Sequence, residues 1–289
     1  MADATEPVVI SDPGEIRGLV LAAGERGRRV GFVPTMGALH AGHVSLVDAA
    51  AVDCDDVVVS IFVNPTQFAP HEDFARYPRT PEADLALLAG RRVRWVFAPR
   101  ADDIYPEGWC TRISVDGPAR RFEGELRPGH FSGVATIVCR LFMAVPAAAA
   151  YFGAKDWQQT LVVRRMVRDL GLPIGIVVCP TVREPDGLAM SSRNAYLAPA
   201  ERPRAVGLSE ALDLAARAWD AGQDAAAMER LMRGHLESRG IAVDYAAVVD
   251  AETLETVRPG AEARALVAGR LGAVRLIDNR PLAPRRAGG

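Results

Sequence analysis

Two histidines three residues apart, His40 and His43, are the clearest chemical signal in the chain. An apolar run at residues 30–33 comes first, followed by Pro34 and a Thr-Met-Gly turn, and apolar residues then recur at helical spacing over residues 41–53. The pattern predicts a strand, a turn and a helix in that order. The start of a helix has unpaired N–H groups and the positive end of the helix dipole, so it favours an anion.

Phosphate is the anion that suits this arrangement best. Gly42 between the histidines lets a ligand approach the backbone closely, and imidazoles can donate hydrogen bonds to phosphate oxygens as negative charge develops. Two alternatives stay open. A His-x-x-His pair can bind a metal, although no third ligand with metal spacing stands nearby, and either histidine could cap the helix or fill space. The pair and its preceding turn favour a nucleotide phosphate.

A single lysine is the second candidate. Lysine and arginine together number 34, and Lys155 is the one lysine among them. It follows Gly153 and Ala154 at a second predicted strand-to-helix turn. Chance is one explanation for its survival. The other is that this position needs a compact ammonium group that the planar guanidinium of arginine cannot imitate.

Two neutral polar residues follow a buried strand. The continuous β-branched run at residues 57–63 suits a strand covered on both faces of a parallel sheet. It ends at Asn64, and Gln67 follows closely. Open α/β sheets bind ligands at the carboxyl ends of their strands. Ordinary turn chemistry before a proline explains Asn64, whereas Gln67 is a weaker turn residue and is a ligand candidate.

Composition excludes several classes of protein. Of the 289 residues 49% are apolar and 24% are charged, which is typical of a soluble globular chain, and the formal net charge of −2 with no basic run argues against nucleic acid. No apolar stretch is long enough for a membrane span and no secretion signal is evident. The four scattered cysteines are expected to be reduced thiols in the cytosol.

Alternating strand and helix patterns predict a doubly wound, Rossmann-like parallel sheet over residues 1–181. After residue 182 the pattern changes to two alanine-rich helices and three short strand-like runs, which predict a smaller α+β domain over residues 182–289. Residues 69–80 could form a mobile lid. Residues 120–131 look too irregular for a helix or strand and too basic for a buried loop, so they could face either an anion or solvent. Residues after Asn279 are expected to be loose.

Several segments together resemble the pantoate–β-alanine ligase (pantothenate synthetase) family of His-x-Gly-His nucleotidyltransferases. They are residues 34–43, 60–68, 77–80, 127–131, 153–156 with the adjoining glutamines 158 and 159, and 190–194. The resemblance spans about residues 8–279. It implies ATP-dependent condensation of (R)-pantoate with β-alanine to pantothenate, AMP and pyrophosphate through a pantoyl adenylate. It also implies Mg²⁺ with the ATP, a cytoplasmic homodimer, and neither nucleic acid nor a membrane as partner.

The resemblance also implies roles for individual residues. The catalytic set is His43, in the acid role, with His40 and Lys155. The expected ATP contacts are Met36, Gly37, His40, Gly42, His43, Gly153, Ala154, Lys155, Asp156, Val182, Met190, Ser191, Ser192 and Arg193. The expected pantoate and β-alanine contacts are Pro34, Met36, Gln67 and Gln159. No protein ligand for a metal is implied, and the first domain would bind nucleotide and pantoate while the second acts as a lid.

Two positions depart from the family pattern. Ala154 stands where an acidic or amide residue is frequent, and Trp157 stands where the side chain is smaller or a tyrosine, so Trp157 could narrow the neighbouring pocket. Two other functions remain open on the residues alone. One is a nucleotidyltransferase of the same fold that acts on a different carboxylate or phosphate, and the other is a nucleotide-binding module without catalysis.

Overall fold

The computed structural model describes residues 6–70 and 72–284 and divides into two compact units. The first unit comprises Met1–Ala154 and Gln158–Pro180, and the second comprises Lys155–Trp157 and Thr181–Gly289. Lys155 and its two neighbours therefore make most of their contacts with the later part of the chain. The predicted domain boundary between residues 181 and 182, and the lid role of the second domain, stay predictions.

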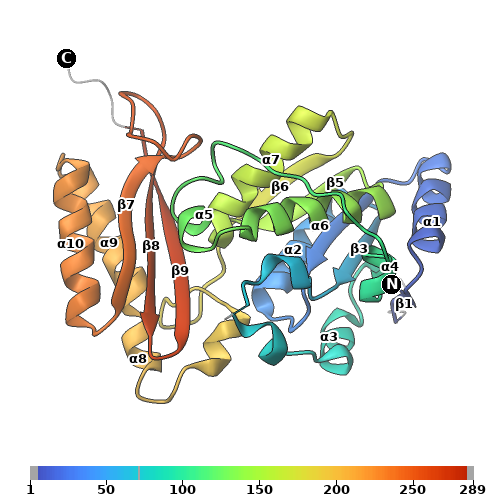
Figure 1. Cartoon of the computed structure of the whole chain (residues 1–289), viewed down its shortest axis with the longest axis horizontal. Coiled ribbons are helices and arrows are strands. Elements are labelled where there is room, and N and C mark those ends of the chain that lie inside the picture. Colours follow the sequence, from blue (N-terminus) through green and yellow to red (C-terminus); the bar gives the residue numbers. More distant parts are fainter. Residues whose placement is uncertain (1–5, 71, 285–289) are drawn as a thin grey trace. The chain divides into compact units, whose positions relative to one another are not determined.

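A six-stranded parallel sheet forms the centre of the first unit (Figure 1). Its order is β1 (Val8–Ile10), β4 (Val93–Phe97), β3 (Asp56–Ile61), β2 (Val30–Thr35), β5 (Ala149–Gly153) and β6 (Gly175–Cys179). Every neighbouring pair is parallel. The predicted doubly wound sheet is confirmed, and its parallel pairing explains why β3 is a continuous apolar run.

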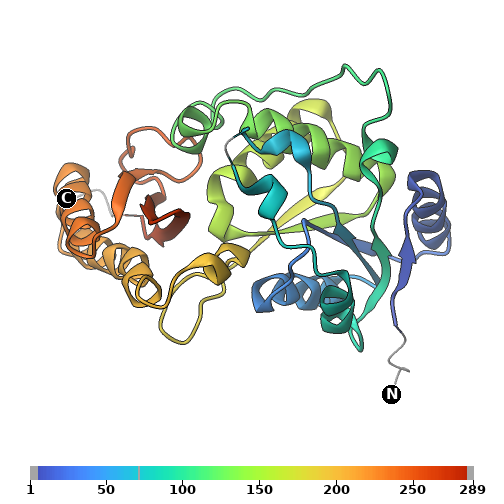
Figure 2. The same cartoon turned by 60° about the horizontal axis from the view of Figure 1, so that its bottom comes forward.

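Helices cover both faces of this sheet (Figure 2). One core joins α1 (Pro13–Glu25), α6 (His130–Ala144) and α7 (Trp157–Leu170) to strand residues such as Phe32 and Val58. The opposite core joins α2 (Ala41–Asp53) and α3 (Pro81–Leu88) to the alternate residues, such as Val33 and Val59. The two-residue period of each strand thus divides its side chains between the two layers.

The order in which the chain adds strands reverses between β2 and β5. From β2 the chain adds β3 and then β4 on one side, whereas β5 and β6 lie on the other. Adjacent strands on either side of such a switch leave a crevice at their carboxyl ends, and open α/β sheets bind ligands there. The turn before His40 follows β2, and Gly153 ends β5. The fold therefore places two of the predicted site segments at neighbouring strand ends.

The second unit is a three-stranded antiparallel sheet with helices packed on it (Figure 1). The strands are β7 (Ala242–Asp250), β8 (Ala263–Leu271) and β9 (Val274–Leu282), and the main helices are α9 (Gly207–Asp220) and α10 (Ala225–Ser238). Ala211 and Ala215 of α9 are fully buried, so the helix lies close to its neighbours. The predicted α+β class of this region is confirmed.

Two local expectations were wrong. Residues 123–126 form a short helix, α5 (Glu123–Leu126), and α6 already begins at His130, because Gly129 takes a left-handed φ of 84° and turns the chain between them. Strand β9 continues past Asn279 to Leu282, which pairs with Ala263, and residues 285–289 of the same expectation lie outside the described residues. Across the described residues, helices are too short or too polar to cross a membrane.

Candidate active site

The turn after β2 is held by buried polar groups. The Thr35 hydroxyl donates to the Ser60 carbonyl at 2.6 Å and accepts from the Gly37 amide at 3.1 Å. Gly37 and Ala38 both have positive φ, 79° and 50°, which is a backbone shape that needs support. Asp84 of α3 supplies that support, because its buried carboxylate accepts from the amides of Ala38 and Leu39 at 3.0 and 2.8 Å.

Removing this carboxylate should destabilise the protein. Asp84→Ala leaves two backbone donors and the Thr80 hydroxyl without their acceptor. We expect the free energy of unfolding to fall by about 2 kcal/mol or more, since each buried donor left unpaired costs ~1–3 kcal/mol. Urea denaturation measures this loss. Asp48→Ala is the matched control, because Asp48 is an exposed partner of Arg91 and should cost under ~1 kcal/mol. Equal losses in the two variants would contradict the role of Asp84.

The histidine pair lies at the start of α2, where His40 is the N-cap residue. The Gly42 amide donates to His40 Nδ1 at 3.1 Å, and the His40 amide donates to His43 Nδ1 at 3.3 Å. Backbone N–H groups can only donate, so both Nδ1 atoms are acceptors and a neutral ring carries its proton on Nε2. The ring centroids are 4.1 Å apart. The helix start therefore carries two Nε2–H donors beside its own amides, a set that suits an oxyanion.

A second cluster surrounds Gln67, the last residue of the short 3₁₀ helix η1 (Pro65–Gln67). Asn64 Nδ2 donates to Gln67 Oε1 at 3.1 Å, and Gln67 Nε2 donates to Met36 Sδ at 3.0 Å. A thioether sulfur is a weak acceptor, so a carboxylate or hydroxyl could replace it readily. The structure thus brings together two predicted substrate contacts, Met36 and Gln67, and adds Asn64.

The backbone of Gln67 is bonded to a partly buried series of charged and polar side chains. His130 Nδ1 lies 2.9 Å from the Gln67 carbonyl oxygen, and His130 Nε2 lies 3.0 Å from Arg127 Nη1. Arg127 forms two bonds with Glu72, at 2.6 and 2.7 Å. Burial and the Arg127 charge lower the pKa of His130 to about 4, so the ring is neutral at physiological pH. Burial alone would raise the pKa of Glu72, but its bonds with Arg127 prevail and lower it.

Adjacent glutamines at the start of α7 have different surroundings. Gln158 is buried, and its amide donates to the carbonyls of Pro118 and Arg121 at 2.7 Å and accepts from the Glu123 amide. It is a structural residue that holds the loop before α5. Gln159 is half-buried in the same turn, and consecutive helical residues face different directions. The Gln159 side chain therefore faces a different direction from that of Gln158, and its predicted substrate role stays a prediction.

Lys155 has an ordered backbone within the second unit. Its carbonyl oxygen accepts from Asn279 Nδ2 at 2.8 Å, and its Nζ lies 4.0 Å from Asp156 Oδ2. Trp157 Nε1 donates to the Ala251 carbonyl at 2.7 Å, and the guanidinium of Arg264 lies 3.4 Å from the indole centroid. Burial lowers the pKa of Arg264 to about 10, at which it is still a cation at neutral pH. The indole of Trp157 therefore has a hydrogen bond to Ala251 and a stacking contact with Arg264.

The second unit also contains the predicted nucleotide loop. The Met190 amide donates to the Val182 carbonyl at 3.0 Å, and residues 183–189 between them form a small hairpin with a turn at Gly187. Arg183 binds the buried Asp278 through two bonds of 2.6 and 3.0 Å, which fastens the hairpin to β9. The Ser191 hydroxyl accepts from the Arg193 amide at 3.3 Å. The predicted contacts Val182 and residues 190–193 are thus neighbours within this unit.

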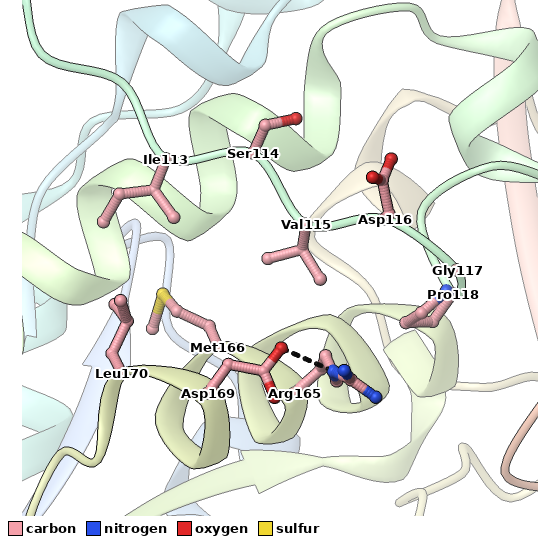
Figure 3. Close-up of a pocket in the computed structure, with 10 residues that line it drawn as sticks. All are labelled: Ile113, Ser114, Val115, Asp116, Gly117, Pro118, Arg165, Met166, Asp169 and Leu170. Carbon is pink, nitrogen blue, oxygen red and sulfur yellow. Dashed lines mark hydrogen bonds and ion pairs between the residues drawn. The ribbon is translucent and has the colours of Figure 1, made fainter.

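A surface groove lies elsewhere in the first unit (Figure 3). It has a volume of about 430 Å³ and lies between the extended segment 113–118 and the second half of α7. Met166 lies at its floor, and Arg165 pairs with Asp169 along its edge at 2.6 Å. None of its lining residues is a predicted site residue. The groove is therefore separate in composition from both clusters described above.

Sequence reasoning missed several residues of the first unit. Asp84, Glu72 and Tyr105 gave no signal of their own, although Tyr105 donates to Asn64 Oδ1 at 2.8 Å. Arg127 and His130 stood in a basic segment that we expected to face an external anion or solvent. Arg127 faces the internal carboxylate of Glu72 instead. The useful signal was the segment Arg127–Phe131, whose arginine and histidine are three residues apart and act together.

Comparison with known proteins places this geometry in a family. Residues 8–281 match the sequence model of the family described as Pantoate-beta-alanine ligase. The pantothenate synthetase of Thermus thermophilus is 53% identical over 260 residues, covering 88% of this chain and 94% of that protein. The pantothenate synthetase of Koribacter versatilis is 47% identical over 274 residues, covering 94% of each.

Solved structures agree with the sequence comparison. The crystal structure of pantothenate synthetase from T. thermophilus is similar with a TM-score of 0.90 and 48% identity, covering 96% of this chain and 100% of that one. The crystal structure of pantoate–β-alanine ligase from Francisella tularensis, complexed with Beta-gamma ATP and β-alanine, has a TM-score of 0.81 and 34% identity, covering 95% and 97%. With relatives this similar over nearly the whole chain, the protein belongs to the pantoate–β-alanine ligase family.

Proposed function

We propose that the chain catalyses the ATP-dependent condensation of (R)-pantoate with β-alanine, giving pantothenate, AMP and pyrophosphate. The observation that carries this proposal is the family match over residues 8–281. The Francisella relative, solved with an ATP compound and β-alanine, adds support for two of the three substrates. The donors at His40 and His43 suit the phosphate chemistry that such a reaction needs.

The reaction would proceed in two steps. A pantoate carboxylate oxygen attacks the α-phosphorus of ATP, the bond to pyrophosphate breaks, and pantoyl adenylate forms. The β-alanine amine then attacks the acyl carbon, the bond to AMP breaks, and the amine loses a proton. Negative charge develops on phosphate oxygens in the first step, so preorganised donors accelerate it. We assign that task to Nε2–H of His40 and His43, with His43 as the acid, and to the Lys155 ammonium.

The remaining contacts divide by chemistry. The amide donors of Gln67 and Gln159 suit the carboxylate and hydroxyls of pantoate, with Pro34 and Met36 beside them, and Gln67 would also border β-alanine. For ATP, we propose contacts from Gly37, Gly42 and the segments 153–156 and 190–193, with Val182 at the base of the second. ATP would bind as its Mg²⁺ complex, because Mg²⁺ usually binds phosphates and keeps several waters. We also propose that the protein is a homodimer located in the cytoplasm.

The direct test is detection of product by mass spectrometry. Purified protein is incubated with pantoate, β-alanine and Mg-ATP, and pantothenate is measured together with AMP. The proposal requires that omission of β-alanine stops steady-state AMP production. AMP release without β-alanine, or with another carboxylate in place of pantoate, would favour a different nucleotidyltransferase. Tight ATP binding with no turnover would favour a nucleotide-binding module.

Substituting the two glutamines tests the pantoate assignment. Gln67→Ala and Gln159→Ala each remove a neutral donor, so we expect pantoate affinity to fall by about tenfold, the effect of ~1.4 kcal/mol, with ATP affinity changed much less. Isothermal titration with each substrate measures both. Gln223→Ala, outside both clusters, serves as a control for loss of a glutamine amide. A change in ATP affinity alone would move either residue to the nucleotide site.

A further inference from the structure

His130 is the feature that the proposed mechanism leaves unused. It lies at the first position of α6, half-buried, between Arg127 on one side and the backbone of Gln67 on the other. Its nearest charged groups are Arg127, Glu123 and Glu72. The ring touches none of the residues that we assign to phosphate. One of its bonds nevertheless reaches the backbone of Gln67, whose side chain links Asn64 to Met36.

The donor and acceptor of each hydrogen bond from Glu72 to Gln67 can be assigned, because a guanidinium can only donate and a backbone carbonyl can only accept. Arg127 has only donors, so His130 Nε2, 3.0 Å away, accepts and carries no proton. The proton of the neutral ring therefore lies on Nδ1, which donates to the Gln67 carbonyl at 2.9 Å. Arg127 itself is oriented by its two bonds to Glu72. Glu72 and Arg127 thus hold the imidazole of His130 in the tautomer whose Nδ1–H donates to the Gln67 carbonyl.

A second chain fixes the side chain of the same residue. The Thr66 amide donates to Asn64 Oδ1 at 3.3 Å, and Tyr105 OH donates to the same oxygen at 2.8 Å. The amide nitrogen of Asn64 must then face the other way, where it donates to Gln67 Oε1 at 3.1 Å. Gln67 Nε2 is therefore the donor on the other side of the amide, where it bonds Met36 Sδ. The two chains approach Gln67 from different elements and determine its backbone and its amide separately.

Close packing makes this arrangement rigid. A Cβ at Gly133, in the first turn of α6, would lie 2.3 Å from the Thr66 carbonyl oxygen and 2.7 Å from Gln67 Cα. The backbone of η1 therefore rests directly on α6, and no residue larger than glycine fits between them. Asn64 Nδ2 also donates to the Gly133 carbonyl at 3.3 Å. Helix α6 therefore supports the backbone of η1, including that of Gln67.

We infer that His130 is a positioning residue for pantoate, which holds the Gln67 backbone so that its amide donor points toward the substrate. The inference rests on the proposed role of Gln67 in pantoate binding. A neutral ring with its proton on Nδ1 is required for this task, and Arg127 with Glu72 maintains it. The effect acts through Gln67 and therefore concerns pantoate more than ATP.

The experiment compares four variants by steady-state kinetics. His130→Ala should raise KM for pantoate about tenfold, the loss of one hydrogen bond worth ~1.4 kcal/mol, and change KM for ATP less than about twofold. His130→Asn keeps a donor at the position of Nδ1, so it should recover most of the loss. Gln67→Ala should raise KM for pantoate as well, and the double variant should be no worse than Gln67→Ala, because the two residues act as one unit.

The tautomer gives a second readout that a merely structural role would not move. Proton–nitrogen NMR of the histidine rings should show His130 protonated at Nδ1, and His40 and His43 protonated at Nε2 when neutral. The signal of His130 is assigned by its loss in His130→Asn. His235→Ala is the control for removal of a histidine, since His235 pairs with Glu210 on the surface of α9 and α10. Thermal melting of every variant separates unfolding from misplacement.

The outcomes distinguish the inference from the function on which it rests. If Gln67→Ala leaves KM for pantoate unchanged, the assignment of Gln67 is wrong and this inference is overturned with it. If Gln67→Ala raises that KM but His130→Ala does not, the inference alone is overturned. Losses that multiply in the double variant, a His130→Asn variant as impaired as His130→Ala, or a proton on Nε2 of His130 would each overturn it too.

Discussion

Alanine in place of His43 or His40 is expected to slow adenylate formation by about 100-fold or more, the loss typical of a removed transition-state donor. Each histidine accepts a backbone amide at Nδ1, so a neutral ring carries its proton on Nε2, the atom to which we assign the bond to a phosphate oxygen. The effect should appear in single-turnover rates with pantoate and Mg-ATP, before β-alanine is added. Binding of ATP should weaken less than the rate falls, because charge on the phosphates increases in the transition state.

The same two variants test whether the histidines have a structural role instead. His40 caps α2, and removal of a cap costs about 1 kcal/mol of stability. His40→Ala should therefore melt slightly earlier than His43→Ala while both lose activity. His235→Ala provides the control, because it removes a histidine from the second unit. Near-normal single-turnover rates in both site variants would withdraw their assignment to phosphate.

Local sequence predicted the frame of this site because its signals are local. An apolar run, a turn and helical periodicity near His40 depend only on neighbouring residues, and they predicted α2 correctly and the start of β2, although β2 continues through Pro34 to Thr35. What the sequence could not provide is Asp84, which bonds Ala38 from 46 positions away. A buried carboxylate on a helix looks like any acidic residue in the first turn until the fold brings it against a strained backbone.

Asn64 shows how a correct local explanation can be incomplete. Its Oδ1 accepts from the Thr66 amide, which is the ordinary turn chemistry expected before a proline. The other half of the same amide holds Gln67, and this half is visible only when η1 and α6 lie together. Gln158 and Gln159 pose the same problem, because helical position rather than residue type decides which one is structural.

Trp157 has an explanation in the structure that its type alone did not suggest. That it could narrow a neighbouring pocket stays a prediction, and the structure adds that its indole bonds the Ala251 carbonyl and stacks on Arg264. Asn279, whose oxygen accepts from Arg264, donates to the carbonyl of Lys155. The indole is thus connected to the Lys155 backbone through Arg264 and Asn279 within the second unit.

Lys155→Arg is expected to fold normally and yet lose most activity, and Lys155→Ala to lose more. The Lys155 carbonyl accepts from Asn279, and Trp157, two residues later, is bonded to Ala251, so a longer, planar side chain cannot readily adjust by moving the main chain. An ammonium group is compact, has three donors that rotate freely, and can follow phosphate oxygens as bonds change, whereas the guanidinium fork has a fixed plane. Charge alone is conserved by the exchange, so any loss measures geometry.

The comparison should be made as kcat/KM for ATP beside thermal melting. We expect a fall of about 10-fold to 100-fold for Lys155→Arg, equivalent to ~1.4–2.7 kcal/mol of transition-state stabilisation, with an unchanged melting temperature. Arg233→Lys, in an exposed pair with Glu237 on α10, makes the reverse exchange and should alter neither quantity. All other lysine or arginine positions in this chain are arginine, so the substitution tests why position 155 is not. Full activity in Lys155→Arg would make the single lysine an accident of composition and remove it from the catalytic set.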